Sequence, residues 1–74
     1  MSLKKVKLIF PPQVLNEPIL FNLNQQFHVV TNIQLADIRG DMGWLVLEIE
    51  GEQSEIDNGL VWLNSMGIRV EPVV

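Results

Sequence analysis

The sequence has no cysteine and only one histidine among its 74 residues. Without cysteine there is no disulfide, no thiolate zinc site, no cysteine-ligated iron–sulfur cluster and no cysteine nucleophile. The single histidine, His28, leaves few pairs of nucleophile and general base, and its place beside Phe27 favours a solvent-facing or carbonyl-bonded ring. We therefore expect no enzyme activity and no cofactor. Four glutamates, Glu48, Glu50, Glu52 and Glu55, could suggest a divalent metal site, but alternation places the first two on an open sheet face and no calcium-loop spacing is present, so we expect no metal site.

Basic residues are also scarce, with five against nine acidic ones and a formal net charge of −4. Such a balance argues against a surface that follows a phosphate backbone. The glycines Gly40 and Gly43 lie between two predicted strands and precede no helix, so they lack the strand-to-helix setting of a phosphate-binding loop. We expect neither nucleic-acid nor nucleotide binding.

Long apolar runs are missing as well. The longest uncharged stretch, residues 18–36, contains Asn, Gln, His and Thr throughout and cannot span a bilayer. The opening segment MSLKKVKLIF enters strand-like alternation without the apolar core or small-residue cleavage site of a signal peptide. These features predict a cytoplasmic protein with no membrane insertion.

Hydrophobic periodicity predicts six secondary-structure elements. Alternation predicts strands in residues 4–12, 28–40, 44–51 and 68–74, and helical spacing predicts helices in residues 15–27 and 52–68. In the first helix Asn16 suits the N-cap and Pro18 the first turn. In the second helix Gly59 is small enough for a close approach to the sheet.

The resulting order, βαββαβ, predicts an α+β fold. Two βαβ-like halves with right-handed crossovers form the ferredoxin-like sandwich, a four-stranded antiparallel sheet with two helices on one face. We expect residues 1–74 to form a single domain in which the first and third strands are central. The second and fourth strands are then edges, and the second can pair with another copy of itself.

The second predicted strand contains Asn32, an unexpected residue because asparagine is a poor strand former. In one interpretation it is an edge-strand residue whose amide bonds to a loop or to water. In the other, its acceptor and two donors hold the carboxylate or ammonium of a small ligand between two chains. A domain this small buries a modest core, and 47% of its residues are hydrophobic, so a second copy would add stability.

The segments FHVVTNIQLADI and GWLVLEIEGEQSEIDNGLVWLNSMGIRVE, with KVKLIFPP before them, resemble the NIL domain over essentially the whole chain. The Asn-Ile-Leu motif that names this family aligns with Asn32, Ile33 and Gln34. Glutamine replaces the motif's leucine, and its amide would favour a ligand more polar than a thioether. The family is known as a ferredoxin-like domain at the C-terminus of methionine-transporter ABC ATPases, where a pair of domains binds methionine and inhibits transport.

The resemblance implies a non-enzymatic regulatory module that binds an amino acid such as methionine at a homodimer interface. Asn32 would lie near the ligand, with the neighbouring strand residues lining the interface: Ile33, Gln34, Leu35 and Ala36. No nucleotide-binding motif is present in this sequence, so regulation of a transporter would act in trans. The alternative is a protein-interaction domain that docks through its exposed strand edge without a small ligand.

Overall fold

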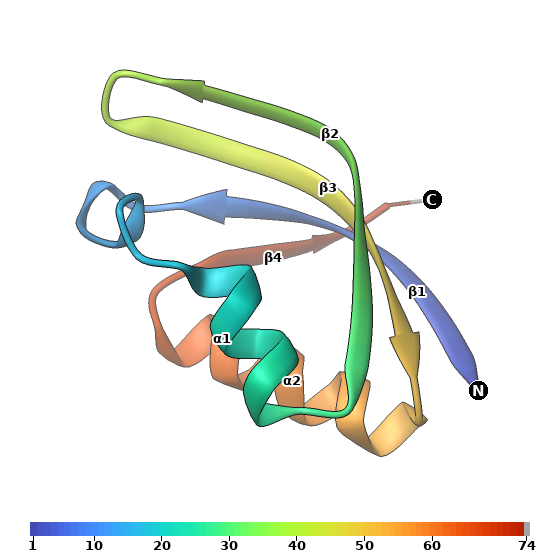
Figure 1. The fold of residues 1–74 in the computed structure, drawn as a ribbon. Coiled ribbons are helices and arrows are strands. Elements are labelled where there is room, and N and C mark those ends of the chain that lie inside the picture. The colour runs from blue at the N-terminus through green and yellow to red at the C-terminus, as the bar shows by residue number, and fades with distance from the viewer. Residues whose placement is uncertain (74) are drawn as a thin grey trace.

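The computed structural model describes residues 1–73 and contains the predicted elements in the predicted order (Figure 1). The strands are β1 (Ser2–Phe10), β2 (Val29–Arg39), β3 (Met42–Gly51) and β4 (Arg69–Pro72). The helices are α1 (Ile19–Gln26) and α2 (Gln53–Ser65), and a short 3₁₀ turn, Pro12–Val14, precedes α1. No helix within residues 1–73 has the length and apolarity needed to span a bilayer.

The four strands form one antiparallel sheet in the order β2-β3-β1-β4. β1 and β3 are therefore central and β2 and β4 are edges, as predicted. Both helices lie on one face of this sheet, and we call the other face the open face (Figure 1). This arrangement confirms the ferredoxin-like α+β sandwich.

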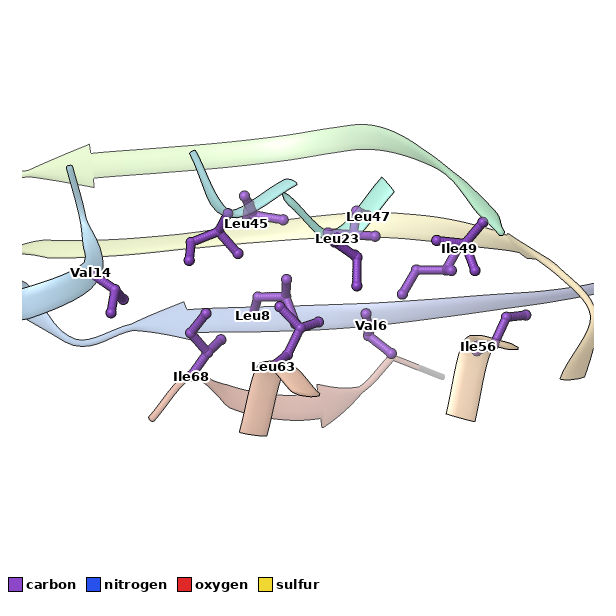
Figure 2. Close-up of a cluster of buried hydrophobic side chains, with 12 residues drawn as sticks. Val6, Leu8, Val14, Leu23, Leu45, Leu47, Ile49, Ile56, Leu63 and Ile68 are labelled. Carbon is purple, nitrogen blue, oxygen red and sulfur yellow. The ribbon is translucent and has the colours of Figure 1, made fainter. Parts of the chain in front are cut away.

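The hydrophobic core lies between the sheet and the two helices (Figure 2). Alternate residues of the central strands enter it, and Val6, Leu8 and Leu47 are completely buried. The helices contribute Leu23, Ile56 and Leu63 to the same cluster. Among residues 1–73 no polar or charged side chain is buried, so apolar burial carries the stability of this layer.

Helix α1 begins later than predicted. Its N-cap is Pro18, not Asn16, and no side chain caps the helix. Glu17 precedes a proline, and the ring of a proline disfavours the helical conformation of the residue before it. A helix cannot therefore run from Asn16 through Glu17, and α1 starts at Ile19.

The close contact at Gly59 differs from the prediction, because it is made with the other helix and not with the sheet. A Cβ atom at Gly59 would lie 3.1 Å from Cδ1 of Leu23 and 3.8 Å from Cδ2 of Phe27. The ring of Phe27 also packs on that of Trp62, with centroids 6.2 Å apart. Gly59 thus allows α2 to pack tightly against α1.

Candidate functional site

The predicted site residues lie on β2, the longer of the two edge strands. Within the described residues β2 pairs only with β3, and its outer backbone groups face away from the sheet. All five predicted site residues are exposed: Asn32, Ile33, Gln34, Leu35 and Ala36. An edge with unpaired N–H and C=O groups can pair with another strand, which is the property that the proposed interface needs.

A β-bulge interrupts β2 at Gln34. Ile33 pairs with Leu47 and Leu35 pairs with Val46, so two successive residues of β3 face three successive residues of β2. Gln34 is the extra residue and has no partner on β3. A bulge of this kind bends the strand and changes which side chains share a face.

The bulge divides the predicted site between the two faces of the sheet. Directly paired residues point to the same face. Asn32 is paired with Glu48 and Leu35 with Val46, which places both on the open face. Ile33 and Ala36 are paired with core residues of β3 and lie on the helix face. The five residues therefore do not converge on one pocket of a single chain.

The Asn32 side chain forms no hydrogen bond among residues 1–73. The structure thus shows no hydrogen bond between the Asn32 amide and a loop of the same chain. Its nearest partner across the strands is Glu48, a half-buried carboxylate. The amide is exposed and remains available for a ligand, water or a second chain.

A depression lies on the open face at the tip of the β2–β3 hairpin, and the sequence interpretation missed the residues that form it. Asp37, Arg39, Met42 and Trp44 line it, from the two strands of the β2–β3 hairpin. Asp37 pairs with Trp44 and Arg39 with Met42, so all four side chains share the open face. A hairpin register drawn from the Gly40 turn would have brought these residues together.

A second, apolar hollow lies at the start of α1. Its walls include Leu15, Leu20, Ile38 and Leu45, with Glu17 as the one charged residue. Ile38 comes from β2, so this hollow also reaches the exposed edge. Its walls offer few polar groups that could orient a ligand.

His28 gives no sign of a catalytic role. Its side chain is exposed, and its backbone N–H donates to Oε1 of Glu55 at 2.8 Å. This bond attaches the start of β2 to the first turn of α2. Within residues 1–73 no group of three or more histidine, aspartate or glutamate side chains is placed to hold a metal ion.

Curated relatives of this chain carry the name of a methionine import ATP-binding protein. The chain is 33% identical over 69 residues to the "Methionine import ATP-binding protein MetN" of Helicobacter pylori strain J99. The match covers 88% of this chain and 21% of that protein. The protein of the same name from Lacticaseibacillus paracasei is 22% identical over 73 residues, which is 93% of this chain and 21% of the relative. The chain thus spans about a fifth of the length of these curated relatives.

A solved structure shares the fold. It is the C-terminal domain of an ABC transporter ATP-binding protein from Enterococcus faecalis, with a TM-score of 0.85 and 23% identity. The similarity covers 95% of this chain and 82% of that one. The family model of the NIL domain matches residues 4–72, nearly the entire sequence. The chain therefore belongs to the NIL domain family.

Proposed function

We propose that this chain is a non-enzymatic regulatory module that binds a small amino acid, methionine first among them, where the β2 edges of two copies meet. It acts on a methionine importer on the cytoplasmic side of the membrane. Similar sequences are found in proteins named for methionine import, which supports this choice of ligand and partner.

The position of Asn32 is the observation that carries the proposal. It belongs to an edge strand that pairs with β3 on one side only, and its exposed side chain forms no hydrogen bond within residues 1–73. Asparagine is disfavoured in strands, and a role in ligand binding would account for its presence there. Its amide offers both donors and an acceptor, which suits the carboxylate and ammonium of an amino acid.

The experiment is a thermal-shift screen of the twenty L-amino acids, followed by calorimetry with those that stabilise the protein. Replacing Asn32 with leucine should leave stability within about 0.5 kcal/mol or raise it, because leucine suits a strand better. The same replacement should weaken the binding of L-methionine by about 1 to 3 kcal/mol, since a polar group of the ligand loses its partner.

A matched control is Asn58→Leu, which changes an exposed asparagine on α2, away from the edge. This variant should bind L-methionine as tightly as the unmodified protein. Absence of both binding heat and thermal shift across all twenty amino acids would reject the proposal. Unchanged methionine affinity in Asn32→Leu would remove Asn32 from the site.

The alternative function is docking of a protein partner on the β2 edge without a small ligand. The exposure of large apolar side chains along this edge favours it: Val30, Ile33, Leu35 and Ile38 are all more than half exposed, at 56%, 56%, 61% and 68%. Edge strands bind extended peptides through main-chain hydrogen bonds, with side chains giving specificity. A null amino-acid screen combined with retained dimerisation would favour this function.

A further inference from the structure

The depression at the tip of the β2–β3 hairpin has a volume of about 230 Å³. Its walls combine one acid, one base and two large apolar side chains: Asp37, Arg39, Met42 and Trp44. Sites for drug-sized ligands are usually larger, about 300 to 1,000 Å³. The volume and the wall chemistry together suit a small molecule that carries both charges and an apolar part.

The two charged groups form an exposed ion pair and still have polar atoms available for a ligand. Nε of Arg39 donates to Oδ1 of Asp37 at 3.0 Å, and the side chains are 85% and 33% exposed. Ion pairs this exposed contribute little to stability. Arginine also has further N–H donors beyond Nε, and a carboxylate has a second oxygen, so both groups can bind a ligand without leaving each other.

The apolar wall is held in place from the side of the central strand. Nζ of Lys7 lies 4.7 Å from the centroid of the Trp44 ring, a cation–π contact on the open face. The Trp44 side chain is half-buried, whereas Met42 is exposed. A methionine side chain is flexible and polarisable, and it can adapt to an aliphatic or thioether ligand chain lying on the tryptophan.

The geometry points to this depression as the pocket for an α-amino acid with an apolar side chain. The guanidinium of Arg39 receives the carboxylate, the carboxylate of Asp37 receives the ammonium, and Trp44 with Met42 contacts the side chain. The assignment rests on the proposed function and supplies the pocket that Asn32 and its neighbours do not form within one chain.

The bulge allows a second copy to complete the pocket. Open-face residues of β2 have even numbers before Gln34 and odd numbers after it. When two β2 strands pair antiparallel about an axis at the bulge, the first half of one therefore lies beside the second half of the other with matching faces. In the register centred between Gln34 and Leu35, Asn32 of the partner subunit lies opposite Asp37, at the border of the depression.

The test is calorimetry with L-methionine on the unmodified chain and on Arg39→Gln and Asp37→Asn. Each variant should lose affinity by about tenfold or more, because each removes a charge-assisted hydrogen bond to the ligand. A competition experiment uses 3-(methylthio)propylamine, which lacks the carboxylate. Its affinity should be about the same for the unmodified chain and for Arg39→Gln. The acid 4-(methylthio)butanoate lacks the ammonium, and its affinity should be about the same for the unmodified chain and for Asp37→Asn.

The other edge strand offers a matched control. Arg69 and Glu71 on β4 form an ion pair of the same spacing, with Nε of Arg69 3.1 Å from Oε2 of Glu71. Their side chains are 73% and 37% exposed, close to the values of the first pair. Arg69→Gln and Glu71→Gln should leave methionine affinity unchanged, and light scattering should show the same oligomeric state for all four variants.

Four results would overturn the assignment. If Asn32→Leu loses methionine and neither Arg39→Gln nor Asp37→Asn does, the proposed function stands and the pocket lies elsewhere. If the β4 variants lose affinity equally, the effect is general electrostatics. If an affinity loss accompanies conversion to monomers, the charged pair serves assembly. If the unmodified chain does not bind L-methionine, the pocket and methionine as the ligand are rejected together.

Discussion

The two edge strands of the sheet differ in length, charge and regularity. β4 has four residues, ends at Pro72 and carries the Arg69–Glu71 ion pair on its exposed side. β2 has eleven residues, contains a bulge and exposes Ile33, Leu35 and Ile38. Short length, charge and proline are the features by which proteins protect a sheet edge from pairing. β4 has that protection and β2 largely lacks it, a difference that supports the interface proposed at β2.

The largest expected effect is on stability, from a substitution in the core that supports both edge strands. Leu63 on α2 is completely buried. Leu63→Ala should lower the free energy of unfolding by about 2 to 5 kcal/mol, because it removes apolar contacts and leaves a cavity. Urea denaturation measures this loss. Leu60 is only half-buried at the border of the core, so Leu60→Ala should cost less; an equal cost would contradict the observed burial.

A smaller effect is expected at the glycines that adjoin the two edges. Gly40 follows β2 with φ +58° and Gly67 precedes β4 with φ +82°. An L-residue in this region is strained by about 1 to 2 kcal/mol, and Gly40→Ala should cost that much even though nothing lies within 4 Å of the added Cβ. Thermal unfolding would show it. Gly40→Asn should cost less, since asparagine tolerates this conformation; equal costs would point to a cause other than backbone strain.

The comparison of edges is tested most directly by placing a lysine on each. We expect the unmodified chain to be a dimer at micromolar concentration. Leu35→Lys on β2 should weaken the dimer by about tenfold or more, since a charge enters the interface, while the stability of the monomer changes by about 0.5 kcal/mol or less. Glu71→Lys on β4 is the control and should leave the dimer intact. Light scattering that reports a monomer for the unmodified chain would contradict the interface at β2.

The smallest expected effect concerns the residue at the bulge. Gln34 is exposed, so Gln34→Leu should change stability by about 0.5 kcal/mol or less. Because an amide is replaced by an apolar group, the affinity for L-methionine should rise relative to that for L-glutamine. A pair of calorimetric titrations gives this ratio. If the ratio stays the same, Gln34 does not contact the ligand.

Much of the architecture could be predicted because its signals are local and redundant. In β3 the alternation of Leu45, Leu47 and Ile49 with the residues between them identified the core face, and the structure confirms it; on the open face Val46 is also buried, at 8% exposure. The start of α1 was misplaced because capping preference at Asn16 competed with the restriction that Pro18 imposes on Glu17. The target of the Gly59 contact was also wrong, since a small residue indicates a close approach without saying to what.

The edge strand that carries the predicted site residues could be predicted, and the depression on the open face could not. The exposed edge and Asn32 follow from the strand order and from the family motif. Asp37, Arg39, Met42 and Trp44 were missed, because strict alternation along β2 assigns Asp37 and Arg39 to the face of Ile33. The structure places them on the opposite face, with Asn32 and Leu35.

The sequence by itself determined the order of the elements, the residues of the core and the position of β2 as an edge strand. Hydrophobic periodicity and the rules for connecting strands and helices can be read along the chain. The tertiary structure decided which side chains of β2 share a face. One unpaired residue, Gln34, reverses the alternation for the rest of the strand. A period of two carries no mark of where such a residue is inserted, so alternation along β2 could not show that Asp37 and Arg39 lie beside Trp44; the pairing of β2 with β3, counted from the Gly40 turn, shows it.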